Sequence, residues 1–275
     1  MGEFDLRALQ LCELDLLKEV DRICKKHDIP YFLAFGTALG AVRHKGFIPW
    51  DDDVDVLMKY PDYLRFQEVC KTELPPHLFY QDWQTDPAYY LPWAKIRNSR
   101  TTSLVPEMAD YLINWGVCVD IFPLFPMKEE TLSQWSLFKI KNIVFFGAKR
   151  INDYGYGKYY YENALLKHIP RWLCKGVRNL FYNSFCKVKE SPFLLFFTGT
   201  NMAKVYPAQW FSSTVDLPFE DASLPLPANY DEYLTRTYGD YMKIPDEQDR
   251  VTHGDLIVDL EKGYEHYQKK GQGSC

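Results

Sequence analysis

Three consecutive aspartates followed by an alternating run constrain this chain more than any other feature. Asp51–Asp53 precede Val54-Asp55-Val56, and the alternation over residues 53–57 predicts a short strand. Side chains alternate across a strand, so Asp53 and Asp55 should share one side while the valines enter the core. Two adjacent carboxylates repel each other in a partly buried site unless a cation joins them. The segment therefore predicts a site for a hard divalent cation, Mg²⁺ or alternatively Mn²⁺.

A third carboxylate fits the same expectation. Asp120 lies between Val119 and Ile121 in an extended segment, residues 117–122. A carboxylate inside an apolar strand is costly to bury without a partner. Asp120 would be satisfied if its strand ran beside Asp53–Leu57, and we expect that arrangement.

The elements before the acidic run set its context. Apolar residues recur with helical spacing from Leu9 to Ile23, which predicts an amphipathic helix with Glu13 among its solvent-facing residues. Residues 31–35 then predict a buried strand, and Gly36-Thr37 opens the next helix. Backbone N–H groups and a hydroxyl at such a helix start can hold a phosphate, although Gly-Thr alone is also an ordinary turn. Strand, Gly-Thr, helix and Asp-x-Asp strand is the layout of the polymerase-β-type nucleotidyltransferase fold.

The whole chain is expected to be α/β (α+β), with a nucleotidyltransferase core sheet flanked by helices. Further strands are predicted near residues 77–81, 90–97, 101–105 and 117–122, and a helix over Asp231–Tyr238. We expect a catalytic core over residues 1–127, a helical basic and aromatic insertion over 128–205, and a C-terminal segment, 206–275, that packs back on the core.

Two other interpretations of the acidic run exist. A solvated acidic turn is the commoner fate of such a triplet. A calcium loop of the EF-hand type beginning at Asp51 would need Gly at its sixth position and Glu at its twelfth. Those positions hold Val56 and Asp62, so the calcium loop is disfavoured.

The longest motif makes the chain recognisable. The segment Phe35–Val56 resembles the LicD family, bacterial phosphorylcholine transferases of cell-surface polymers with fukutin and fukutin-related protein as distant relatives. The resemblance continues at the following positions: Trp93–Arg97, Gly116–Leu124, Tyr238–Met242, Arg250 and His253. It covers most of the chain, and residues 128–205 match least.

The resemblance implies a reaction. It implies that Asp53, Asp55 and Asp120 form the catalytic metal triad, with the two preceding aspartates supplementing it. Phosphocholine would pass from CDP-choline to a hydroxyl of a teichoic-acid or other cell-surface glycan precursor, and CMP would leave. The alternatives are another phosphoalcohol donor (CDP-glycerol or CDP-ribitol), metal-dependent hydrolysis, or a glycan-binding relative without catalysis.

Several side chains are candidates for substrate binding besides Gly36 and Thr37. Lys95, Arg97 and Arg43 carry the positive charge that a diphosphate requires, although basic residues are also common on exposed strand edges. Trp50 is a candidate for stacking on cytosine or choline, and His253 for contacting phosphate. Five more aromatic residues are candidates for a choline cage, with core packing as the ordinary alternative: Trp83, Tyr89, Tyr90, Trp93 and Trp115.

Composition limits the partners. The 275 residues are 47% hydrophobic and carry a net charge of −5, which predicts a folded protein and gives no reason to expect nucleic acid. Seven cysteines without a C-x-x-C pair suggest a reducing compartment. No signal-peptide stretch is recognisable near the N-terminus. We therefore expect a cytoplasmic protein, or one peripheral to the inner face of the plasma membrane.

One segment departs from this acidic balance. Residues 139–189 hold eleven Lys or Arg residues against two carboxylates. The segment is either a solvated basic helical face or a surface for an anionic membrane or a polyanionic, lipid-linked acceptor. The second interpretation uses an apolar stripe between Leu165 and Phe181, on a helix that Pro170 should start.

Overall fold

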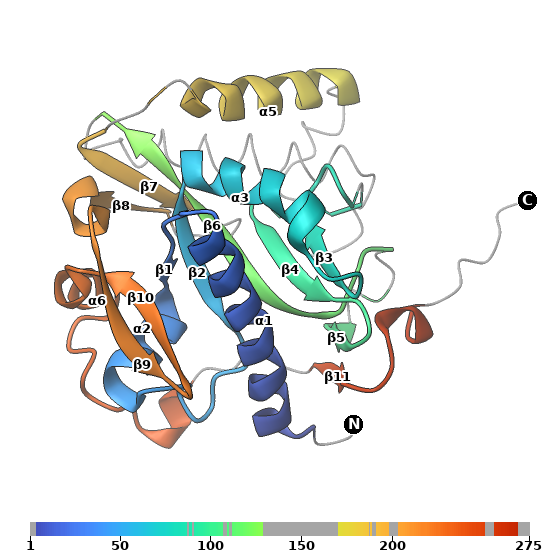
Figure 1. Ribbon diagram of the computed structural model, residues 1–275, viewed down its shortest axis with the longest axis horizontal. Coiled ribbons are helices and arrows are strands. Elements are labelled where there is room, and N and C mark those ends of the chain that lie inside the picture. The colour runs from blue at the N-terminus through green and yellow to red at the C-terminus, as the bar shows by residue number, and fades with distance from the viewer. Residues whose placement is uncertain are drawn as a thin grey trace, which may run out of the picture.

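The fold is seen in a computed structural model (Figure 1). It describes residues 4–86, 88, 89, 91–106, 109, 112–128, 170–186, 188, 191–197, 203–250 and 256–268. The chain is mixed α/β with a curled mixed sheet. Most of the predicted basic insertion, together with Tyr90 and His253, lies outside the described residues.

Within the described ranges, seven strands form one sheet whose main path runs β1-β2-β6-β4-β3. Their bounds are β1 Phe32–Leu33, β2 Asp55–Lys59, β3 Leu78–Gln81, β4 Ala94–Asn98 and β6 Val117–Met127. β2 and β6 are parallel, and the other neighbours on this path are antiparallel. The far end of β6 pairs with β7 (Phe193–Phe197), which pairs with β8 (Ala203–Pro207).

Helices α1 (Leu6–Lys26) and α3 (Tyr60–Glu73) lie across one face of the sheet (Figure 1). The predicted stripe of α1 is confirmed, because Leu9, Val20 and Ile23 are fully or almost fully buried. Asp5 caps this helix by accepting a hydrogen bond from the N–H of Ala8 at 3.1 Å. Pro61 stands in the first turn of α3, a position that proline favours.

Elements distant in sequence gather beside β1. Helix α2 (Phe35–His44) lies near α6 (Tyr230–Tyr238) and the hairpin of β9 (Thr214–Phe219) and β10 (Ala222–Pro227) (Figure 1). The first residue of α2, Phe35, has a φ of 42°, and its N–H donates to the buried Tyr233 hydroxyl at 3.1 Å. The C-terminal segment thus holds the start of α2.

The remaining elements complete the frame. β5 (Thr102–Leu104) pairs with β11 (Ile257–Asp259), which returns the chain end to the core. α5 (Arg171–Cys186) crosses the top of the view in Figure 1, directly after Pro170. Short 3₁₀ turns cover Ala208–Phe211, Glu247–Asp249 and Tyr264–His266.

Three sequence expectations differ from the structure. β2 begins at Asp55, so Asp53 lies in the loop before it rather than within the strand. β4 begins at Ala94, four residues later than expected. β7 and β8 fall inside or across the end of the predicted insertion yet extend the core sheet, because β6 is long enough to pair with β4 and then with β7.

Two glycines give a matched test of this packing. A Cβ on Gly40 of α2 would lie 2.4 Å from the carbonyl oxygen of Gly46, whereas a Cβ on Gly176 of α5 meets nothing within 4 Å. Gly40→Ala should lower the free energy of unfolding by about 1–3 kcal/mol. Gly176→Ala should raise it by up to about 1 kcal/mol through helix propensity. Urea unfolding of both variants measures this, and equal effects would contradict the packing described.

Candidate active site

Strand register brings the acidic residues together. Asp55 pairs with Asp120 across the parallel β2–β6 ladder, and Lys95 of β4 pairs with Asp120 from the other side. The Asp120 N–H also donates to the Val54 carbonyl at 2.8 Å. The prediction that the Asp120 strand runs beside the acidic segment is confirmed.

Negative charge exceeds positive charge where Asp53, Asp55 and Asp120 lie close to Lys95. Burial raises the pKa of Asp55 well above its usual value, and the carboxylates of Asp53 and Asp120 raise it further. Lys95 forms an ion pair with Asp120. Burial lowers the pKa of Lys95, but the Asp120 carboxylate and Cys118 together more than offset this, so the pKa ends above its usual value. Lys95 therefore stays charged and offsets part of the negative charge.

The donor chemistry of this acidic cluster (Asp53, Asp55 and Asp120) fits a hard divalent cation, which prefers carboxylate oxygens. Burial and then the neighbouring carboxylates raise the pKa of Asp55, and a bound cation would offset that unfavourable charge. Within the described ranges, no three Asp, Glu, His or Cys side chains are gathered as a ready metal-binding group. A bound cation therefore requires these carboxylates to turn toward a common point.

The start of α2 fixes the acidic loop. Thr37 Oγ1 accepts a hydrogen bond from the Asp55 N–H at 2.9 Å. A Cβ on Gly36 would lie 2.5 Å from Asp51 Oδ2, so only glycine lets this carboxylate approach the helix start. Gly36 and Thr37 thus lie against the acidic segment, as the sequence predicts for a helix that opens onto the site. Their role toward phosphate stays a prediction.

Two buried polar residues of α1 support the same loop. Gln10 Nε2 donates to the carbonyl oxygens of Asp51 at 2.9 Å and Ile48 at 3.3 Å. Glu13 is 4% exposed, and burial, followed by Cys118 and Asp53, raises its pKa well above the usual value. The expectation that Glu13 faces solvent is wrong, because the α1 surface that carries it is covered.

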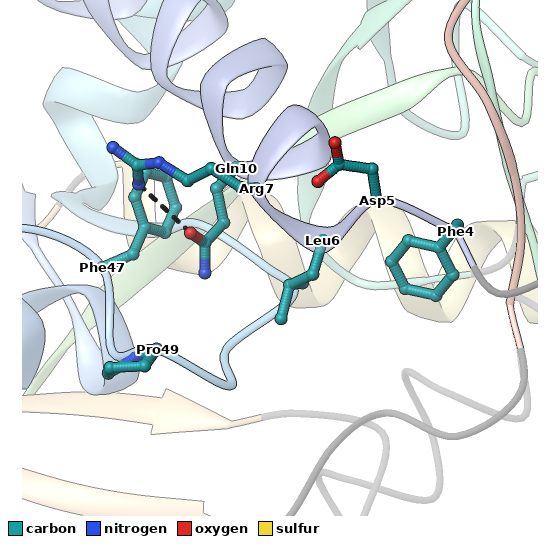
Figure 2. Close-up of a pocket in the computed structure, with 7 residues that line it drawn as sticks. All are labelled: Phe4, Asp5, Leu6, Arg7, Gln10, Phe47 and Pro49. Carbon is teal, nitrogen blue, oxygen red and sulfur yellow. Dashed lines mark hydrogen bonds between the residues drawn. The ribbon is translucent and has the colours of Figure 1, made fainter.

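A wide pocket of about 680 Å³ adjoins this loop support (Figure 2). It lies between the start of α1 and the loop before the acidic run, and Arg7, Gln10, Phe47 and Pro49 are among its lining residues. Figure 2 shows Gln10 beside Arg7, which donates a hydrogen bond to Gln10 Oε1 at 3.2 Å. None of the three cluster carboxylates lines it, so the pocket is not assigned to the reaction.

Two of the predicted phosphate ligands have structural contacts instead. Arg97 is 3% exposed and donates to Gln81 Oε1 at 2.8 Å and to the Gly116 carbonyl at 2.6 Å. Arg43 donates to the carbonyls of Tyr241 at 2.9 Å and Lys243 at 3.2 Å. These contacts argue against direct roles for both arginines in substrate binding.

Arg250 lies against the loop before the aspartates, although its sequence context did not predict a site residue. The Arg250 guanidinium lies 4.3 Å from the centre of the Trp50 ring, and Trp50 immediately precedes Asp51. Tyr238 is also close, since its pKa is raised by burial and then by the carboxylates of Asp55 and Asp51. Arg250 and Tyr238 both lie in segments that resemble the LicD family, and only this resemblance pointed to them from the sequence.

Residues 28–150 match the family described as "LicD/FKTN/FKRP, nucleotidyltransferase domain". The chain is 30% identical over 268 residues to "Lipopolysaccharide cholinephosphotransferase LicD" of Haemophilus influenzae, covering 92% of this chain and 97% of that protein. The chain belongs to the LicD family. Uncharacterized proteins of Rickettsia typhi and Rickettsia prowazekii are 41% and 40% identical over 63 residues, which cover 23% of this chain and 20% and 23% of theirs.

The aromatic candidates divide into two groups in this LicD-family chain. Tyr89 and Trp115 are buried in a small apolar cluster with Leu104 and Ile113, which is a packing role. Trp83 and Trp93 instead line a cavity between α3 and α5.

The apolar stripe predicted near Pro170 is partly visible on α5. Trp172 and Leu180 are each 73% exposed, and Leu173 and Val177 are exposed beside them. Phe181 faces inward and packs on Phe125. In the part of the chain that the structure describes, no helix has the length and apolarity required to cross a membrane. Contact of this stripe with an anionic membrane stays a prediction.

The Lys95–Asp120 ion pair can be tested apart from catalysis. Lys95→Met should lower the free energy of unfolding by about 3–5 kcal/mol, because it leaves buried carboxylates without their cation. Adding Asp120→Asn to Lys95→Met should restore most of the loss. Lys18→Met, which breaks an exposed pair with Asp221, should cost at most about 1 kcal/mol. Urea unfolding in metal-free buffer measures all three, and a Lys95→Met effect as small as the control would refute the account.

Proposed function

We propose that this chain is a metal-dependent phosphotransferase that moves phosphocholine from CDP-choline to a hydroxyl of a cell-surface glycan precursor, releasing CMP. The observation that carries the proposal is the strand register that sets Asp55 beside Asp120 with Lys95 opposite. It is supported by family membership, since the Haemophilus influenzae relative is named a lipopolysaccharide cholinephosphotransferase.

The proposed fold of the core is that of nucleotidyltransferases. Its support is the order of β1, α2 and β2, with Gly36-Thr37 in the first turn of α2 and Asp55 at the start of β2. The description of the matching family contains the same domain name.

In this proposal, Asp53, Asp55 and Asp120 would hold the cation, Mg²⁺ or alternatively Mn²⁺. Such an ion supplies positive charge that polarises a phosphoryl oxygen and offsets charge on the leaving group. The protein supplies the remaining effects. Lys95 pairs with Asp120 and holds it in place, and Thr37 holds Asp55 through its backbone N–H.

Two positive groups near the acidic loop would meet the phosphate groups of the donor. The first turn of α2, which contains Gly36 and Thr37, is the positive end of the helix dipole. The Arg250 guanidinium lies over Trp50, next to the acidic loop. These groups would hold the diphosphate while a carboxylate oxygen of Asp55 or Asp120 accepts the proton of the acceptor hydroxyl.

The donor and acceptor are the finer part of the proposal. Lipopolysaccharide is named for the Haemophilus relative, whereas teichoic acid rests on the sequence resemblance. A CDP-glycerol or CDP-ribitol donor would use the same cluster, and these donors differ only in the alcohol. A glycan-binding protein without catalysis has no need for carboxylates whose proximity costs stability.

The experiment measures CMP released from CDP-choline, CDP-glycerol and CDP-ribitol with Mg²⁺, with and without a lipopolysaccharide acceptor. We expect release from CDP-choline that requires Mg²⁺. Asp53→Asn and Asp55→Asn should each reduce it at least about 100-fold, because each removes a charge from the cluster. The matched control is Asp221→Asn, an exposed carboxylate paired with Lys18, which should keep wild-type activity.

Retained CMP release in both cluster variants would refute the metal assignment. CMP release from another CDP-alcohol in place of CDP-choline would refute CDP-choline as the donor, and the proposed phosphotransferase reaction would stand. Absence of CMP release from every donor, with and without acceptor, would contradict the proposal that the chain is an enzyme of this kind.

A further inference from the structure

A second cavity, of about 280 Å³, lies between α3, α5 and the segment that joins β3 to β4. It is close to the lower end of the range for ligand pockets, about 300–1,000 Å³. Five aromatic side chains form part of its wall: Tyr60, Tyr63, Trp83, Trp93 and Tyr182. None of the residues of the acidic cluster lines it.

The aromatic wall is held in place. The guanidinium of Arg178, itself 4% exposed, lies 3.6 Å from the centre of the Trp83 ring and covers one face of the indole. Tyr60 stacks on Tyr63 and on Tyr182, with ring centres 6.1 and 6.2 Å apart. Rigid rings that are apolar on their faces provide contact area at low entropic cost.

Free amide groups face the same space. Asn179 and Asn183 are one turn apart on α5, both exposed, and their side chains make no hydrogen bond to the part of the chain described. Gln84 is exposed on the opposite side, whereas Gln67 already donates to Asp82 at 2.6 Å. Each amide both donates and accepts hydrogen bonds. Hydroxyl groups match that pattern, and a quaternary ammonium, which neither donates nor accepts, does not.

Trp93 links the wall of the cavity to strand β6, which carries Asp120. Trp93 precedes Lys95 by two positions, and its ring centre lies 4.9 Å from that of Phe122. Phe122 in turn follows Asp120 by two positions on β6. Trp93 and Phe122 thus connect the cavity wall to the strand that carries Asp120.

We propose that this cavity binds a sugar ring of the acceptor glycan, with the aromatic wall against the ring and the amides of Asn179 and Asn183 on its hydroxyls. This proposal rests on the proposed function only in identifying the bound sugar as part of the acceptor. It assigns the aromatic residues Trp83 and Trp93 to a sugar rather than to choline.

The test is saturation-transfer difference NMR on the full chain with methyl glycosides of galactose, glucose and N-acetylglucosamine, and with choline chloride. We expect saturation of at least one glycoside and none of choline. The double variant Asn179→Ala/Asn183→Ala should reduce the glycoside signal at least about fivefold. The control Gln209→Ala, an exposed amide outside the cavity, should keep it.

Both asparagines are exposed on a helix where alanine is favourable, so the double variant should keep the fold, and circular dichroism verifies this. Saturation of choline alone, absence of saturation by every glycoside, or an unchanged signal in the double variant would each overturn the proposal. CMP release is measured separately, so failure of the enzyme assay with glycoside binding intact would refute the proposed function and leave the sugar site standing.

Discussion

Parallel pairing of β2 with β6 is the constraint on which the candidate site depends. It sets Asp55 and Asp120 at one level of the sheet, where two carboxylates repel each other at low dielectric. The surrounding contacts act against that repulsion. Lys95 pairs with Asp120, Thr37 holds the backbone of Asp55, and Gln10 fixes the loop before it. The neighbouring residues therefore hold together an arrangement that electrostatic repulsion opposes.

Much of this arrangement was predictable from sequence, for identifiable reasons. The periodicity of α1 and the pattern over Asp231–Tyr238 are local signals, and the structure confirms both helices. The place of Asp120 was predictable because a lone carboxylate in an apolar strand needs a partner. The exclusion of Asp53 from β2 was not predictable, because the start of the strand depends on where its ladder with β6 begins.

Other features depend on contacts that local patterns do not record. Glu13 has the spacing of a solvent-facing residue, yet it is buried near Cys118 and the acidic loop. Arg97 has the spacing of a site residue, yet its donors bond Gln81 and a backbone carbonyl. Arg250 reaches Trp50 from 200 positions along the chain. In each case tertiary packing, rather than propensity, decides what the side chain contacts.

Thermal unfolding of the wild type and Asp55→Asn, each with and without Mg²⁺, tests the central claim most directly, because it reads the cluster without any substrate. Without metal, the variant should unfold at the higher temperature, by about 2–4 °C for each kcal/mol of repulsion removed. Mg²⁺ should raise the unfolding temperature of the wild type and leave that of the variant unchanged. Equal stabilisation of both proteins by Mg²⁺, or a less stable variant in metal-free buffer, would contradict a carboxylate cluster built to receive a cation.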